Sequence, residues 1–156
     1  MKKTSRLLLS VAVCLLIGFL GSLVTTPSVS TWFSTVNKPS FSPPNWLFAP
    51  VWTILFILMG ISAYLVWNKG LKKKAVKEAF LIFVFQLVLN FLWSLFFFGL
   101  HQPFLASLEI IVLWVAILLT ILKFRKISAA AGYLLLPYIA WVTFASFLNF
   151  TIARLN

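Results

Sequence analysis

The sequence contains very few acidic residues, a single histidine and a single cysteine. Among its 156 residues, two are Asp or Glu and 13 are Lys or Arg. The lone cysteine, Cys14, cannot form an internal disulfide, and the lone histidine, His101, cannot build a metal cluster by itself. These shortages exclude a disulfide-stapled secreted module, and no metal site is predicted.

Charge of either sign is also scarce. Charged residues make up 10% of the chain and hydrophobic residues 62%, whereas about 25% of the residues in an average soluble domain are charged. So few charges cannot cover a globule in water, and so many apolar residues do not fit a disordered chain. The composition therefore excludes a soluble enzyme and predicts an integral membrane protein.

Long apolar runs fill most of the chain, and five of them are long enough to cross a bilayer as helices. They cover residues 7–24, 46–67, 79–100, 104–122 and 129–153. Backbone groups in lipid must bond within their own segment, which favours helices over open strands. We predict an all-α five-transmembrane-helix bundle that forms one membrane domain over residues 1–156. The first run also has the pattern of a cleavable signal peptide, an alternative that the four later runs disfavour.

The basic residues lie in short clusters between these runs. Three precede the first run, five lie between the second and third, and three lie between the fourth and fifth. Such clustering disfavours nucleic acid as a partner, because a nucleic-acid binder spreads its cations over one face. The clusters share one side of the membrane, so the positive-inside rule predicts a cytoplasmic N-terminus and an external C-terminus.

The connection over residues 25–45 is much longer than the others and contains four prolines, Pro27, Pro39, Pro43 and Pro44. Proline restricts the backbone, and a long ordered loop in a compact protein is usually functional. We predict that this loop covers a pocket as a lid. The alternative is a plain spacer between the first two spans.

Polar, small and aromatic side chains recur at helical spacing inside the predicted spans, so each set occupies one helix face. The sets are Gly18 and Ser22; Trp52, Phe56, Gly60, Ala63 and Trp67; Gln86, Asn90 and Ser94, bordered by Trp93 and Phe97; and Tyr138, Trp141, Ala145 and Asn149. Such a face either joins helices or lines a small-molecule cavity. Helix contact is favoured for Gly18 and Ser22, and both interpretations remain open for Gln86 and Asn90.

No conventional catalytic motif is present. The chain lacks a phosphate-binding glycine loop, a nucleophile elbow and the HExxH zinc motif. Glu109 is the only acid within a span, and no second acid and no base lies within the spans to pair with it, which disfavours a proton-coupled transporter. The roles of Glu109 and Trp114 are not assigned by the sequence.

Four segments form a specific set in fixed order. They are KPSFSPPNW at 38–46, PVW at 50–52, QLVLNFLWS at 86–94 and PYIAW at 137–141. In these segments the chain closely resembles the translocator protein and tryptophan-rich sensory protein family (TspO/MBR, the peripheral benzodiazepine receptor family). The resemblance implies a five-helix bundle, commonly a homodimer, with a ligand cavity beneath the long loop.

The resemblance also implies the ligands. Family members bind porphyrins such as protoporphyrin IX and haem, cholesterol in animals, and synthetic benzodiazepine and isoquinoline compounds, without an intrinsic cofactor. The ligand-binding residues expected in this chain are Ser22, Trp52, Phe56, Asn90, Trp93, Trp141 and Ala145. Phe56 stands where many relatives have tyrosine. Bacterial members are associated with light-dependent breakdown of protoporphyrin, and the tryptophans that match Trp52 and Trp141 are implicated as catalytic residues.

Two other functions remain open at this point. The protein is alternatively a transporter of porphyrin or other hydrophobic molecules across the membrane, or a ligand-binding stress sensor. Sterol binding is not predicted, because the family's sterol pattern is matched only by Leu148, Phe150 and Arg154, with phenylalanine in place of tyrosine.

Overall fold

The computed structural model describes residues 1–156 and is all-helical. Its α-helices are α1 (Lys3–Val29), α2 (Trp32–Thr35), α3 (Phe48–Trp67), α4 (Lys74–Ser94), α5 (Pro103–Ile127), α6 (Ala129–Leu134) and α7 (Leu136–Leu155). A 3-10 turn, η1 (Asn45–Leu47), precedes α3, and a π-helical turn, η2 (Leu95–Gly99), extends α4. Five helical segments are long and apolar enough to cross a membrane, as predicted, and the protein is a multi-pass integral membrane protein.

The first helix continues to Val29, five residues beyond the predicted span end at residue 24. Pro27 lies in its last turn, where a missing N–H removes only one helical hydrogen bond. The hydroxyl of Thr31 donates to the carbonyl oxygen of Pro27 at 2.8 Å and so satisfies one carbonyl at the helix end. This extra turn carries polar residues that the sequence had placed in the loop.

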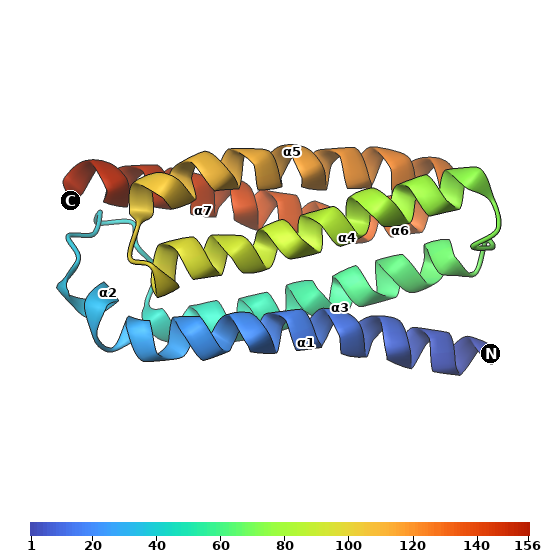
Figure 1. The fold of residues 1–156 in the computed structure, drawn as a ribbon, viewed down its shortest axis with the longest axis horizontal. Coiled ribbons are helices and arrows are strands. Elements are labelled where there is room, and N and C mark those ends of the chain that lie inside the picture. Colours follow the sequence, from blue (N-terminus) through green and yellow to red (C-terminus); the bar gives the residue numbers. More distant parts are fainter.

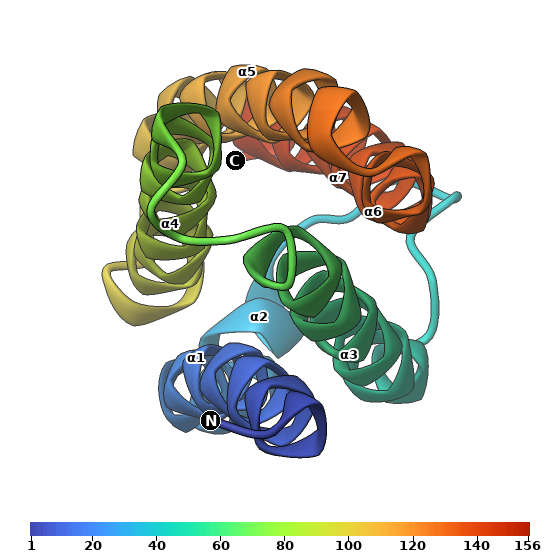
Figure 2. The same ribbon diagram turned by 90° about the vertical axis from the view of Figure 1, so that its right-hand side faces the viewer.

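The five long helices form two groups (Figures 1 and 2). One group is the antiparallel pair α1 and α3, which crosses closely because Gly60 has no side chain; a Cβ atom there would lie 2.5 Å from the Cα of Val11. In the other group α5 packs between α4 and α7, with α6 continuing beside it. The groups meet where the Ser62 hydroxyl donates to the Ala131 carbonyl oxygen at 2.7 Å.

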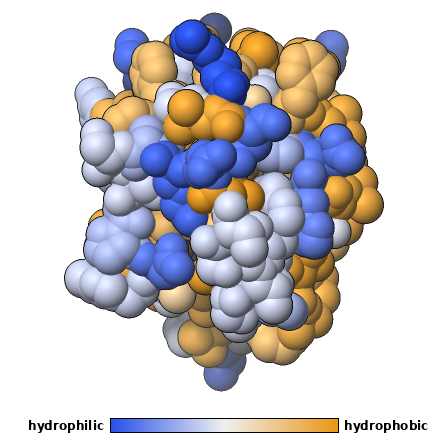
Figure 3. Space-filling view, turned by 90° about the vertical axis from the view of Figure 1, so that its left-hand side faces the viewer, coloured by the Kyte–Doolittle hydropathy of each residue, from blue (hydrophilic) through white to orange (hydrophobic).

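The two ends of the bundle differ in what they carry. The N-terminus and the basic α3–α4 connection lie at one end, and α2, the α4–α5 connection and the C-terminus lie at the other (Figure 1). In the space-filling view, hydrophilic and weakly polar side chains cover much of the centre of that second end, and hydrophobic side chains lie mainly toward its edge (Figure 3). The apolar core, which includes Met59, Ile117 and Phe124, fills the middle and the basic end of the bundle. Apolar side chains such as Leu81 and Phe147 are exposed on the outside, as a bilayer requires.

Candidate functional site

A cavity of about 410 Å³ lies between α1, α3 and α4 at the end of the bundle that carries α2. A volume of this size is typical of a small-molecule site. The lining residues are Ile17, Gly18, Gly21, Ser22, Thr25, Thr26, Val29, Ser30, Phe33, Asn45, Phe48, Ala49, Trp52, Phe56, Asn90, Trp93, Ser94 and Phe98. The cavity therefore separates the two helix groups just below the long connection.

Aromatic side chains form the walls of this cavity. Trp52 and Phe56 lie one turn apart on α3, with ring centroids 5.8 Å apart. Across the cavity, Trp93 meets Phe98 edge to face at 6.0 Å on the α4–η2 segment. Stacked and edge-to-face rings hold one another in fixed orientations. The cavity thus presents rigid flat surfaces from two sides.

The short helix α2 covers the cavity. Its Phe33 is 2% exposed and packs edge to face against Phe98 at 5.5 Å and Phe97 at 6.1 Å. The ammonium group of Lys38 lies 4.6 Å from the Phe33 ring centroid and donates a hydrogen bond to the Val36 carbonyl oxygen. The long connection is therefore an ordered cover, and part of it lines the cavity.

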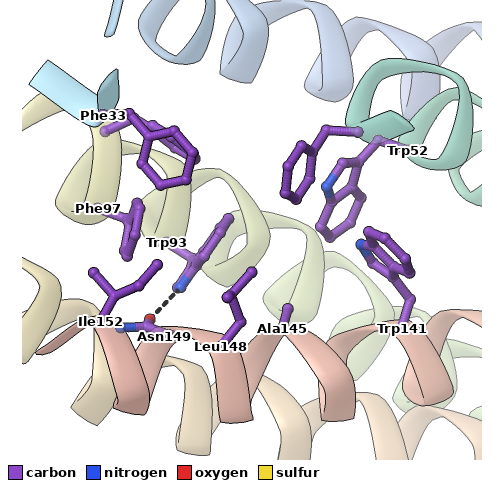
Figure 4. Close-up of a pocket in the computed structure, with 11 residues that line it drawn as sticks. Phe33, Trp52, Trp93, Phe97, Trp141, Ala145, Leu148, Asn149 and Ile152 are labelled. Carbon is purple, nitrogen blue, oxygen red and sulfur yellow. Dashed lines mark hydrogen bonds between the residues drawn. The ribbon is translucent and has the colours of Figure 1, made fainter. Parts of the chain in front are cut away.

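A second, much smaller pocket of about 20 Å³ adjoins the cavity (Figure 4). Trp52 and Trp93 line both spaces, and α7 contributes Trp141 and Ala145 to the smaller one. Trp141 packs against Phe48 at the start of α3, with ring centroids 6.2 Å apart. All seven predicted ligand-binding residues are thus brought together, five around the cavity and the last two, Trp141 and Ala145, behind it.

The indole N–H groups near the site differ in their hydrogen bonding. Trp93 Nε1 donates to Asn149 Oδ1 at 2.9 Å, and Trp114 Nε1 donates to Thr143 Oγ1 at 2.9 Å. The N–H groups of Trp52 and Trp141 make no hydrogen bond within the protein and are not fully enclosed. Neither of these two N–H groups is therefore committed to a partner within the protein.

Beneath the cavity, buried polar side chains form a continuous hydrogen-bonded chain. Asn90 Nδ2 donates to the Tyr138 hydroxyl at 2.8 Å, and this hydroxyl donates to Gln86 Oε1 at 2.7 Å. Gln86 Nε2 lies 3.9 Å from the thioether of Met59 as a weak donor. Gln86 therefore joins α4 to α7 and α3, whereas Asn90 both joins helices and lines the cavity.

Several site residues were not found by sequence reasoning. Phe33, expected only as part of the loop that covers the pocket, lines the cavity itself. Thr25 and Thr26, expected in the connection, lie in the last turns of α1 and also line the cavity, as does Ser30 just after the helix. Trp114, unassigned from sequence, joins α5 to α7 through Thr143. Glu109 is 8% exposed, and neither of its carboxylate oxygens has a hydrogen-bond partner; it lines none of the spaces described above.

Comparison with known proteins agrees with this architecture. Residues 10–155 match the model of the TspO/MBR family. The chain belongs to the TspO/MBR family. Tryptophan-rich protein TspO of Chlorobaculum tepidum is 46% identical over 155 residues, which are 99% of this chain and 98% of the relative. The protein of the same name from Archaeoglobus fulgidus is 48% identical over 151 residues, 97% of each chain.

More distant TspO/MBR members include animal proteins. Human translocator protein is 36% identical over 140 residues, which cover 88% of this chain and 82% of the human one. The family resemblance inferred from the motifs around Trp46, Trp52, Asn90 and Trp141 is thereby confirmed.

Proposed function

We propose that this TspO/MBR protein binds a porphyrin of the protoporphyrin type in the cavity beneath α2 and promotes its oxidative degradation in light. The observation that carries the proposal is the covered cavity of about 410 Å³ with indole and phenyl walls. A flat aromatic ring stacks well on such walls, and each ring contact contributes about 0.5–1.5 kcal/mol beyond its buried area.

The polar residues of the cavity fit the remainder of a porphyrin. Ser22, Thr25, Thr26, Ser30 and Asn45 lie at its α2 end, where the propionate groups would remain near water. Lys38 follows α2 in the same connection and supplies a positive charge near that end. A ligand with an apolar ring and two carboxylates on one edge therefore matches both halves of the site.

The proposed chemistry needs no metal or acid–base pair, because the porphyrin itself absorbs the light. Dissolved dioxygen is the oxidant. Trp52 on α3 lines the cavity, and Trp141 on α7 lies next to it in the small adjoining pocket (Figure 4). Their electron-rich rings donate an electron to the excited porphyrin, which passes it to dioxygen. The indole radical then takes an electron back from the porphyrin, so the porphyrin is the net electron donor and dioxygen the acceptor. We assign the catalytic role to these two tryptophans.

A binding titration tests the first half of the proposal. Protoporphyrin added to the purified protein in detergent is expected to shift its Soret band and to quench tryptophan fluorescence in a saturable manner. Trp52→Phe is expected to weaken binding by less than tenfold, since phenyl still stacks. Trp46→Phe is the matched control, because Trp46 is 72% exposed and lines neither pocket. Absence of saturable binding by the parent protein contradicts the proposal.

Illumination in air tests the second half. With saturating protoporphyrin, Trp52→Phe and Trp141→Phe are expected to slow the light-dependent loss of the Soret band about tenfold or more, with Trp46→Phe at the parent rate. Darkness or removal of oxygen is expected to stop the loss. Equal rates in parent and both pocket variants would show that these tryptophans are not catalytic.

The carrier alternative is less well supported, because the cavity does not continue through the bundle to its basic end. Toward the basic end its floor is closed by the core around Gln86, Met59 and Tyr138, each 1% exposed or less. A carrier would move porphyrin across protein-containing liposomes, and this flux would persist in Trp52→Phe. Such flux without pigment loss would favour the carrier over the proposed activity.

A further inference from the structure

The deep end of the cavity carries one amide, Asn90. Along the α4–η2 segment the lining residues are Phe98, Ser94, Trp93 and Asn90, and eight residues of helix place Asn90 about 12 Å below Phe98. The facing residues at this depth, Phe56 and Ile17, are apolar. Asn90 is therefore the polar group that meets whichever edge of a ligand enters first.

The hydrogen-bonded chain below the cavity fixes which end of the Asn90 amide is already used. The Tyr138 hydroxyl has one proton, and it donates this proton to Gln86 Oε1. Toward Asn90 the same hydroxyl can only accept, so it takes a hydrogen from Asn90 Nδ2. One of the two N–H groups of the Asn90 amide is engaged with Tyr138, and the amide oxygen accepts no hydrogen bond within the protein.

The contact between Gln86 and Met59 disfavours the opposite orientation of the Gln86 and Asn90 amides. In that arrangement the Gln86 amide would be turned over, the Tyr138 hydroxyl would donate to Asn90, and the Asn90 nitrogen would face the ligand. The Gln86 oxygen would then lie against the Met59 thioether in place of the nitrogen that is 3.9 Å from it. Both atoms are acceptors, and an unpaired buried acceptor is costly. Met59 and Gln86 are thus positioning residues for the Asn90 amide.

The oxygen of Asn90 is accessible from the cavity. It accepts no hydrogen bond within the protein, yet it is not among the fully enclosed unpaired atoms. Asn90 as a whole is only 5% exposed, and the space it lines is the cavity. We propose that Asn90 is a specificity-determining residue that presents a hydrogen-bond acceptor at the cavity floor, so that the site prefers ligands with an N–H or O–H donor on their leading edge.

For a porphyrin, the inference predicts a preference for hydrogen-bond donors among the substituents on one edge of the ring. The inference rests on the proposed function, in which the propionates stay at the polar α2 end of the cavity. The opposite edge, which carries the vinyl groups in protoporphyrin, then reaches Asn90. A hydroxyl on that edge donates to the Asn90 oxygen, and the Ser94 hydroxyl lies one turn away on the same wall. An ether at the same place has no hydrogen to donate to the Asn90 oxygen.

Three porphyrins that differ on this edge test the inference. Haematoporphyrin carries hydroxyethyl groups there, its dimethyl ether carries methoxyethyl groups, and mesoporphyrin carries ethyl groups. The wild-type protein is expected to bind haematoporphyrin about tenfold more tightly than the dimethyl ether, the size of one net hydrogen bond. Asn90→Leu is expected to bring this ratio to about one while porphyrins still bind.

A second variant tests the positioning role without touching the ligand contact. Met59→Leu conserves volume, which cores tolerate well, but it removes the thioether acceptor. It is expected to lower the ratio of hydroxyl to ether affinity several-fold, because the Asn90 amide is then less strongly held in one orientation. Leu113→Met, in the same core at 1% exposure, is the control and is expected to keep the wild-type ratio.

The outcomes separate this inference from the proposed function. Equal binding of all three porphyrins by the wild type overturns the acceptor at Asn90 and leaves porphyrin binding intact. Failure of every porphyrin to bind overturns the proposed function itself. If Met59→Leu keeps the wild-type ratio of hydroxyl to ether affinity, the positioning role of Met59 is overturned. If Asn90→Leu keeps that ratio, the role of Asn90 is overturned.

Discussion

The indole of Trp93 on α4 donates its N–H to the side-chain oxygen of Asn149 on α7, at 2.9 Å. Asn149 Nδ2 in turn donates to the Ser107 hydroxyl at 2.9 Å and to the Pro103 carbonyl oxygen at 2.8 Å, both on α5. One amide thus joins three helices and fixes the plane of a cavity wall. The orientation of Trp93 depends on residues outside the cavity.

Replacing Asn149 by leucine is expected to lower the free energy of unfolding by about 1–2 kcal/mol, because buried hydrogen-bonding groups on two other helices lose their partner. Thermal unfolding in detergent micelles measures this change. Porphyrin affinity is expected to fall as well, since the Trp93 ring is no longer held in one plane. Ser146→Ala is the control, because the Ser146 hydroxyl bonds only within its own helix, to Val142. Equal losses in both variants would contradict the role given to Asn149.

Helical spacing predicted much of this site, but it did not predict which residues on neighbouring helices hydrogen-bond to one another. The intervals between Asn90, Trp93 and Ser94 place them on one face, and the structure puts that face on the cavity. The same reasoning could not match Trp93 with Asn149 or Trp114 with Thr143. Such pairs depend on how far each helix is rotated and shifted against its neighbour, which packing decides and a single helix pattern does not encode.

The long loop was expected over a pocket, but the helical turn at the cavity mouth was not predicted, for a local reason. Hydropathy drops after Val24 and Pro27 follows, so residues 25–29 read as loop although they form the last turn of α1. The carbonyl groups freed there accept from side chains, as in the Thr31 bond to Pro27. A helix end sustained by such local bonds is not visible in a hydropathy profile.

Gly60 gives a test of how α1 and α3 pack. The sequence placed it on the same stripe as Trp52, but in the structure it faces α1, and an added Cβ would lie 2.5 Å from the Val11 Cα. Backbone cannot yield as a side chain can, so Gly60→Ala is expected to destabilise the protein by about 1–3 kcal/mol. Thermal unfolding in micelles measures the effect.

Gly21→Ala is the matched variant for that experiment. A Cβ at Gly21 would lie 3.5 Å from the Ser94 hydroxyl oxygen, which is ordinary contact. Its unfolding temperature is therefore expected to stay within a few degrees of the parent. If Gly60→Ala proves as stable as Gly21→Ala, the close crossing of α1 and α3 is wrong.

The cover of the cavity is attached to the end of α7 through two asparagines. The Asn37 backbone N–H donates to Asn156 Oδ1 at 3.0 Å, and Asn156 Nδ2 donates to the Asn37 carbonyl oxygen at 3.0 Å. Asn156→Ala removes both bonds at an exposed site. Porphyrin is expected to dissociate about two- to tenfold faster, because the cover opens more often, while thermal stability changes little.

Stopped-flow displacement of bound porphyrin measures this dissociation rate. Thr151→Ala is the control on the same helix, since the Thr151 hydroxyl bonds only to the Phe147 carbonyl oxygen one turn earlier. An unchanged rate in Asn156→Ala would contradict the prediction, because it would show that the bonds between Asn37 and Asn156 do not control ligand exit.

The side of the membrane on which the cavity opens can be tested with single cysteines. Eleven of the 13 basic residues lie at the end opposite α2, so the positive-inside rule predicts that the covered end lies outside the cytoplasm. In a Cys14→Ala background, Ser40→Cys is expected to react with a membrane-impermeant maleimide on intact cells. Lys72→Cys, equally exposed at the basic end, is expected to react only after permeabilisation. The reverse pattern would place the cavity mouth in the cytoplasm, and porphyrin would then have to enter from the inside.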